Sequence, residues 1–180
     1  MRIRSGSVEL VAFEPALTQA VHAVRNHPSV REHLRDARPI PWESHARWVE
    51  ENLIRSRRQH LFVARRAEKP FGITLLRNFE GAQAEIGVMV VEPRRNRHAA
   101  YVAAHLIGYY AFEVLGLERV LSYVPRGHRE ALDFNRRCGF EPAGEASAEY
   151  DVLTLSCTSS RTHPAHRRFR ERRKIVVERG

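Results

Sequence analysis

The segment from Val88 to Tyr101 places basic side chains where a helix begins. An apolar run typical of a buried strand leads into a loop that holds Arg94, Arg95 and Arg97, and a helical pattern starts at about His98. The first turn of a helix presents free N–H groups and a partial positive charge, and guanidinium groups bind phosphate oxygens well. The junction therefore predicts a phosphate-binding loop, with a solvent-exposed basic loop as the alternative.

Other common chemical motifs are missing from the sequence. It contains neither a GxGxxG motif nor a P-loop, so the dinucleotide and nucleoside triphosphate fingerprints are excluded. Its two cysteines, Cys138 and Cys157, form no CxxC pair, which excludes a disulfide framework and a thiolate zinc site. We expect no metal, and we expect Cys138 to be a packing residue rather than a nucleophile.

A second segment of interest, HREALDFNRRCGFEPAG, runs over residues 128–144. Ala131, Phe134, Asn135 and Cys138 share one face of a predicted helix that ends at Gly139. Such a helix is common in many folds. Its position after a strand, the basic loop, a long helix and another strand is what makes it informative.

The periodicity of apolar residues predicts the elements that position these segments. We expect strands over 8–13, 61–65, 71–77, 84–91, 120–124 and 150–155, helices over 17–24, 42–54, 98–114 and 131–138, and a further strand between 140 and 148. The strand over 84–91 is apolar almost throughout, which predicts burial on both faces. This order indicates one α/β domain with a mixed sheet.

Composition fits a globular domain with an unevenly charged end. The chain has 180 residues, 43% of them hydrophobic, and a formal net charge of +9. Residues 158–180 contain eight Lys or Arg and two acids, so this segment carries +6 of that charge. No apolar run approaches the ~20 residues of a membrane span, and the start lacks a secretory apolar stretch, so we expect a reduced, cytoplasmic protein without membrane partners.

The basic end has three interpretations. It is a solvated terminal segment with a charged helix from about Ala165, or it binds a nucleic acid or an acidic partner, or it packs on another subunit. Phe169 is its single aromatic residue, so base stacking has little support.

Three segments of the chain resemble the GNAT superfamily of acetyl-CoA dependent N-acetyltransferases. They are AEIGVMVVEP (84–93), RRNRHAAYVAAHLIGYYAFEVLGLERV (94–120) and ALDFNRRCGFEPAG (131–144). Residues 24–34 and 39–53 resemble the branch that acetylates ribosomal-protein N-termini and nucleotide-linked amino sugars. The resemblance implies a mixed, mostly antiparallel central sheet with helices on both faces, a single domain over 1–157, and acetyl-CoA as cosubstrate. Residues 158–180 lie outside it as a basic C-terminal tail.

The resemblance also implies which residues hold the cosubstrate and catalyse the reaction. It implies direct acetyl transfer in a ternary complex, with Glu85 as the base and Asn135 at the position of the family's Tyr. The cofactor-binding residues are Val88, Met89, Val90, Arg94, Arg95, Asn96, Arg97, His98, Ala99, Ala100 and Asn135. The backbone N–H groups of 88–90 would stabilise the thioester oxygen.

The sequence departs from the family pattern in three places. The loop has no glycine, so the Cβ of His98 would crowd the approach to a pyrophosphate. The amide of Asn135 cannot protonate a leaving thiolate as the family's Tyr is proposed to do. His128 stands where the family has Asn ahead of the helix.

The acceptor is implied only as a primary amine. It is an amino sugar, a small amine or a protein N-terminus, and the expected substrate-binding residues are Arg25, Asn26, Arg31, His45 and Trp48. His45 either relays the proton of the amine or packs in the core. A homodimer is compatible with the branch. The alternative function is a weakly catalytic GNAT-like binding module whose tail binds nucleic acid or an acidic partner.

Overall fold

The computed structural model describes residues 1–34, 36–56, 58–144 and 148–179. In these residues, strands form one sheet in the order β7-β8-β6-β5-β4-β3-β2-β1-β9. The strands are β1 (Arg2–Ser5), β2 (Val8–Ala12), β3 (His60–Arg66), β4 (Lys69–Glu80), β5 (Gln83–Val90), β6 (Arg119–Pro125), β7 (Glu141–Pro142), β8 (Tyr150–Ser156) and β9 (Val176–Glu178).

One pair of neighbouring strands differs from the rest. β5 and β6 are parallel, whereas the other described neighbours are antiparallel. The long helix between β5 and β6 accounts for this, because a parallel pair needs a crossover connection. The sheet is therefore mixed and mostly antiparallel, as the resemblance implies.

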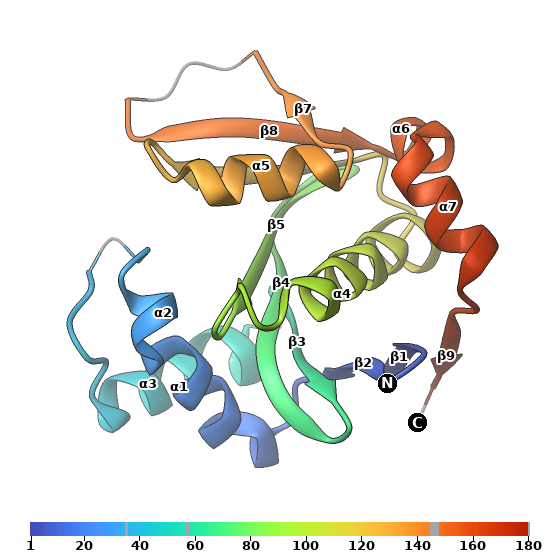
Figure 1. Ribbon diagram of the computed structural model, residues 1–180. Helices are drawn as coiled ribbons and strands as arrows, with labels where there is room; N and C mark the ends of the chain where they lie inside the picture. The colour runs from blue at the N-terminus through green and yellow to red at the C-terminus, as the bar shows by residue number, and fades with distance from the viewer. Residues whose placement is uncertain (35, 57, 145–147, 180) are drawn as a thin grey trace.

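Helices cover both faces of this sheet (Figure 1). They are η1 (Pro15–Leu17), α1 (Thr18–Asn26), α2 (Pro28–Arg31), α3 (Trp42–Val49) with η2 (Glu50–Arg55), α4 (Arg97–Tyr109) with η3 (Tyr110–Val114), α5 (Arg129–Arg137), α6 (Cys157–Thr162) and α7 (Pro164–Arg172). None of the helices in the described part of the chain has the length and apolar character needed to cross a membrane.

Two apolar clusters hold these layers together. The larger lies between the sheet and α4, where Ala103, Leu106 and Ile107 are completely buried. The smaller lies on the opposite face, where Val21 of α1 and Val49 of α3 pack on Val63 and Ile73 of the sheet. Burial of these side chains accounts for the apolar periodicity of α1, α3 and α4.

Most of the expected elements are confirmed, and the differences have local causes. Four elements, β1, β9, α2 and α6, were not predicted from the sequence, because they are short or polar. Burial of 84–91 on both faces is wrong, because only Ala84 and Ile86 of β5 are buried and the rest of the strand is half-buried. The strand expected between 140 and 148 exists as β7, and residues 145–147 of that range lie outside the described residues.

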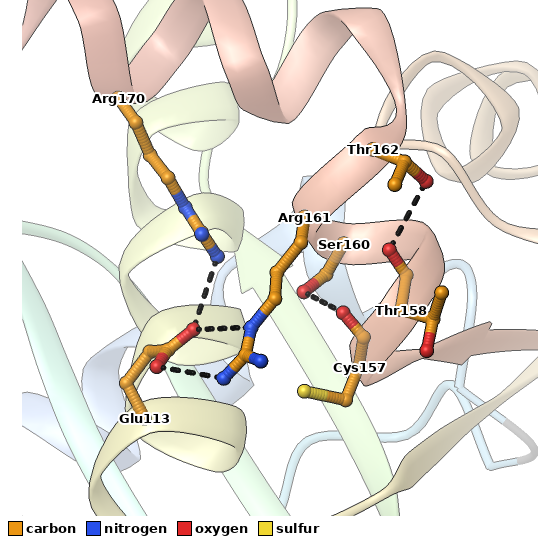
Figure 2. A network of polar contacts seen from close by, with 7 residues as sticks. All are labelled: Glu113, Cys157, Thr158, Ser160, Arg161, Thr162 and Arg170. Atoms are coloured by element: carbon orange, nitrogen blue, oxygen red, sulfur yellow. Dashed lines mark hydrogen bonds and ion pairs between the residues drawn. The ribbon is translucent and has the colours of Figure 1, made fainter.

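The basic C-terminal segment packs against the domain. His166 and Phe169 of α7 are buried, and the ring of Phe169 lies 4.5 Å from that of His105 in α4. Figure 2 shows Arg161 and Arg170 converging on Glu113 of η3, with N–O distances of 3.2 and 3.4 Å. The charged helix expected from about Ala165 is confirmed as α7, whereas the interpretation of this end as a solvated segment is wrong.

The last strand anchors the same segment at its other end. β9 pairs antiparallel with β1 from Arg2↔Glu178 to Arg4↔Val176, and Arg4 contacts Glu178 at 3.2 Å. The C-terminal segment thus extends the sheet through β9 and covers α4 through α7. The division of the chain at residue 157 into a catalytic part and a tail stays a prediction.

We predict that Phe169→Ala lowers the free energy of unfolding by about 3 kcal/mol, because it removes a buried ring and leaves a cavity beside α4. Urea denaturation measures the change. Arg172→Ala, at an exposed position on the same helix, is the matched control and is expected to shift stability by less than about 0.5 kcal/mol. A Phe169→Ala effect as small as that of the control would show that α7 does not pack in solution.

Candidate functional site

The centre of the site is the place where β5 and β6 part. Their parallel pairing covers only three residue pairs, from Gln83↔Arg119 to Glu85↔Leu121, although β5 continues to Val90 and β6 to Pro125. From Ile86 onward, β5 pairs with no strand of the described residues on the side of β6. Residues 88–90, whose backbone N–H groups the resemblance assigns to the thioester oxygen, lie in this open part of β5.

The loop between β5 and α4 leaves backbone donors at the start of a long helix. Glu92 takes a left-handed φ of 46°, and its carbonyl accepts the N–H groups of Arg95 and Asn96 at 3.0 Å. Buried Asn96 donates its side-chain amide to the Val91 carbonyl at 2.7 Å, which fixes the turn. Among the described residues, the N–H groups of residues 97–99 have no backbone acceptor outside the helix, so they are available to an anion.

Three guanidinium groups surround this helix start. The side chains of Arg94 and Arg95 are 92% and 78% exposed and make only long contacts, 3.4 Å to Glu130 and 3.5 Å to Glu92. Arg97 is also exposed. Exposed ion pairs of this kind contribute little stability, so a phosphate group can displace the two carboxylates at small cost.

His98 points to the C-terminal segment rather than to the opening of the sheet. Arg173 donates from Nη2 to Nε2 of His98 at 2.6 Å, because a guanidinium has no acceptor atom. The His98 ring does not line the neighbouring cleft. The ring is therefore held to one side, whereas the Cβ of His98 stays on the loop backbone, so the expected crowding by that Cβ stays a prediction.

A cleft of about 650 Å³ lies beside the loop. Its walls come from three places: the turn after β5, the residues that follow α2, and the start of α5. They include Glu32, His33, Arg94, Arg95, His128 and Glu130. A second cleft of about 440 Å³ adjoins it between the end of β6 and the start of β8, and shares Glu32, His33, Gly127 and His128 with the first. Neither Glu32 nor His33 was predicted from the sequence as a site residue.

Glu85 lies at the last paired residue of β5 before the strands part. Its Oε1 accepts two N–H groups from Arg77 of β4, and its Oε2 accepts the Asn78 amide at 2.7 Å. A carboxylate has about four lone-pair sites, so one site on Oε2 stays available for a proton. The side chain is only 13% exposed. Glu85 is thus paired with an arginine, and its role as the base stays a prediction.

Asn135 and Cys138 lie at the other side of the opening, on and after α5. The Asn135 amide donates to the Ala131 carbonyl at 2.9 Å, and its side chain is half-buried. Cys138 is 2% exposed, and burial raises the pKa of its thiol to about 12. A thiol with that pKa is a poor nucleophile near neutral pH, which supports its expected packing role.

The structure brings Arg25 and Trp48 together on the α1 side of the sheet. The Arg25 guanidinium carbon lies 4.4 Å from the centre of the Trp48 ring, a cation–π contact. Burial lowers the pKa of Arg25, and the charge of nearby Arg77 lowers it further. Arg77 in turn binds Glu85 of β5.

The other three expected substrate residues support the local fold. Asn26 bonds both the N–H and the carbonyl of Ile40, and Arg31 donates to the carbonyls of Asn26 and Ala37. His45 is completely buried and its Nε2 lies 3.3 Å from the Thr18 carbonyl. Burial lowers the pKa of His45 to about 4. These contacts favour packing over proton relay for His45.

Comparisons with known proteins agree with this architecture. The family model described as acetyltransferase (GNAT) domain matches residues 7–141. FdhC, an apo nucleotide-linked sugar GNAT, shares 18% identity and a TM-score of 0.76 over 92% of this chain and 97% of its own. The spermidine N-acetyltransferase of Vibrio cholerae in complex with CoA and spermine shares 16% identity and a TM-score of 0.72 over 85% and 97%.

A GNAT-family acetyltransferase from Bacillus anthracis is similar to the same degree, with 15% identity and a TM-score of 0.68 over 88% of this chain and 99% of its own. No curated protein sequence matches the chain. At these identities the likeness to solved structures shows the fold, and it confirms the expected mixed sheet with helices on both faces.

Proposed function

The chain belongs to the GNAT acetyltransferase family, and from this premise we propose that it transfers the acetyl group of acetyl-CoA directly to a primary amine bound in the same complex. The observation that carries the proposal is the opening of the sheet between β5 and β6 beside a basic helix start. The opening exposes backbone donors, and the helix start offers phosphate-binding groups.

The residues of the loop fit the phosphates of acetyl-CoA. The N–H groups of residues 97–99 and the guanidinium groups of Arg94, Arg95 and Arg97 would hold them, with Asn96 fixing the turn. The arm of the cosubstrate would lie in the cleft of about 650 Å³ that begins at Arg94. Side-chain cations would thereby replace the glycine-rich approach that this loop lacks.

In the proposed acetyl transfer, β5 has two roles. The backbone N–H groups around 88–90, on the part of the strand that β6 does not cover, would stabilise negative charge on the thioester oxygen. Oε2 of Glu85 would accept a proton from the acceptor's ammonium group, directly or through one water, so that the free amine can attack.

The acceptor side carries positive charge, which favours an anionic acceptor. Arg25 and Arg77 lie close enough to lower the pKa of Arg25, and a polycationic amine would add to that repulsion. A nucleotide-linked amino sugar offers phosphates to both groups and a sugar face to Trp48. We therefore propose this acceptor class ahead of a polyamine or a protein N-terminus, and the likeness to FdhC supports it.

Release of free thiol from acetyl-CoA with a panel of amines tests the proposal. The panel contains a nucleoside-diphosphate amino sugar, spermidine and a short peptide with a free N-terminus. We expect the nucleotide-linked sugar to turn over fastest, and Arg25→Gln to raise its KM about tenfold without changing CoA affinity measured by calorimetry. Fastest turnover of spermidine would overturn the acceptor class, and absence of CoA binding would overturn the function.

A further inference from the structure

One side chain from another part of the fold reaches the residue at which the loop between β5 and α4 turns. Ser29 lies in α2, and its Oγ accepts the backbone N–H of Glu92 at 2.9 Å. Figure 1 shows α2 beside the turn that leads from β5 into α4. The contact joins residues that are 63 positions apart in the sequence, so it is a product of the tertiary fold.

Glu92 is a strained position of this loop. Its φ of 46° lies in the left-handed region, which is unfavourable for a residue with a Cβ. Pro93 follows directly and restricts the backbone of Glu92 further. A residue in such a conformation keeps it only where the surrounding structure holds it there. The contacts of the Glu92 backbone therefore decide the shape of the loop.

The backbone N–H and carbonyl groups of Val91 and Glu92 each have a partner. Val91 donates its N–H to the Phe71 carbonyl at 2.9 Å, and its carbonyl accepts the Asn96 side-chain amide at 2.7 Å. The Glu92 carbonyl accepts two N–H groups of the loop at 3.0 Å. These bonds stay within the loop and strand β4, whereas the bond from Ser29 ties the turn to α2.

His27 fixes the direction of the bond between Ser29 and Glu92. The backbone N–H of Ser29 donates to Nδ1 of His27 at 3.3 Å, so Nδ1 is a ring nitrogen that carries a lone pair. The Ser29 hydroxyl lies 2.8 Å from the same atom and therefore donates its proton there. Its oxygen keeps its lone pairs for the Glu92 N–H, so the hydroxyl is oriented as an acceptor toward the loop.

The turn at Glu92 passes directly into α4. The Glu92 carbonyl accepts the N–H of Asn96, the residue that precedes the helix, at 3.0 Å. The Asn96 carbonyl in turn accepts the N–H of Ala100 in the first turn at 2.8 Å. A change in the conformation of Glu92 would shift these acceptors, and with them the N–H groups of residues 97–99. Ser29 thus acts on the phosphate-binding groups through Glu92 and Asn96.

We propose that Ser29 is a positioning residue for the cosubstrate, because it holds Glu92 in the left-handed conformation that shapes the phosphate-binding loop. This inference rests on the proposed binding of the acetyl-CoA phosphates at that loop. Ser29 acts through the loop backbone and has no part in the chemistry of acetyl transfer. Binding groups that are already in place need no ordering when the ligand arrives, so loss of the Ser29 bond weakens binding rather than catalysis.

The test compares the wild type with Ser29→Ala, Ser29→Thr and the control Ser56→Ala, in the full chain. Two quantities are measured for each protein without an acceptor: the dissociation constant of CoA by calorimetry, and the exchange rate of the Glu92 amide hydrogen by NMR. Ser29→Ala removes the acceptor atom, whereas Ser29→Thr keeps a hydroxyl. Ser56 is an exposed serine that donates to the Asn52 carbonyl at 2.8 Å and lines neither of the two clefts.

We expect Ser29→Ala to weaken CoA binding about tenfold, which is the usual effect of one hydrogen bond, and to speed exchange of the Glu92 amide by a similar factor. Ser29→Thr and Ser56→Ala should keep both quantities within about twofold of the wild type. With the panel amine that turns over fastest, Ser29→Ala should raise the KM of acetyl-CoA about tenfold while kcat stays within about twofold. A variant that was merely unfolded in part would instead lower kcat and leave KM unchanged.

Two results would overturn the proposal. One is a Ser29→Ala variant that binds CoA as tightly as the wild type. The other is any Ser29 variant in which CoA affinity and protection of the Glu92 amide do not change together, because Ser29 would then act by another route. A wild type that binds no CoA would overturn the proposed function itself, and the positioning role with it. A wild type that binds CoA beside an unchanged Ser29→Ala overturns the positioning role alone.

Discussion

Replacing Glu85 with Gln is expected to lower kcat about 100-fold, which is the usual contribution of a positioned general base. The amide fills the same volume but cannot take up a proton. Glu85 lies where β5 and β6 part, and Oε2 keeps a free lone-pair site beside the bond from Asn78. The loss should appear in kcat and in kcat/KM alike, because the proton moves only as the amine becomes a nucleophile.

The position of Glu85 also allows a sharp control. Glu80→Gln changes an exposed carboxylate at the end of β4 and is expected to leave kcat within about twofold of the wild type. CoA affinity, measured by calorimetry, should be the same in both variants, because neither residue lies in the phosphate-binding loop. If Glu85→Gln turns over at the wild-type rate, Glu85 only anchors Arg77 and the base lies elsewhere.

The parts of the site that could be predicted from the sequence are those that depend on neighbouring residues in the chain. A strand that ends in Glu92-Pro93, a loop with Arg94, Arg95 and Arg97, and a helix from about His98 follow each other within a few residues. Local patterns of this kind determine where an element begins and ends. The structure therefore places α4 within one residue of the predicted start.

Side-chain contacts between segments that are distant in the chain could not be predicted from the sequence. The stack of His33 on His128 depends on α2, a helix of four residues that begins at Pro28 and is too short to show a helical period. The clamp of Arg77 and Asn78 on Glu85 depends on the register between β4 and β5, which no local pattern states. In both cases the contact depends on the tertiary fold, which no local sequence pattern shows.

The C-terminal segment shows the same limit on a larger scale. Its eight cationic residues outweigh its few apolar ones, so composition suggested a solvated end. The structure shows that one aromatic ring, Phe169, and a three-residue strand attach it to α4 and β1. Two of its arginines are bound to Glu113, so they also contribute to packing.

Three buried histidines make the fold sensitive to acid. A backbone carbonyl receives one N–H of each ring: Thr18 from His45, Tyr101 from His105 and Cys138 from His166. The second nitrogen of His45 and of His105 is buried without a partner among the described residues. Burial is the main cause that lowers the pKa of His45 and His166 to about 4 and that of His105 to about 3.

The sign of the pH dependence follows from these values. In the unfolded chain the same imidazoles titrate at about 6.5, so below that pH the unfolded state binds protons that the folded state refuses. The contribution of these three histidines to stability is therefore constant above about pH 7 and falls as the pH drops from about 6 to about 4. The slope is roughly 1.4 kcal/mol per pH unit for each histidine, or about 4 kcal/mol per pH unit for all three together.

A loss of that size is large for a domain whose total stability is typically about 5–15 kcal/mol, so we expect acid unfolding between about pH 5.5 and 4. Urea titrations at pH 7.5, 6, 5.5 and 5 measure the slope. His105→Phe keeps a ring against His166 and Phe169 but cannot be protonated, and should reduce the slope by roughly 1.4 kcal/mol per pH unit. Its stability at pH 7.5 gives the packing cost separately, because the wild-type ring is neutral there. A slope that His105→Phe leaves unchanged would mean that His105 is already accessible to protons in the folded state.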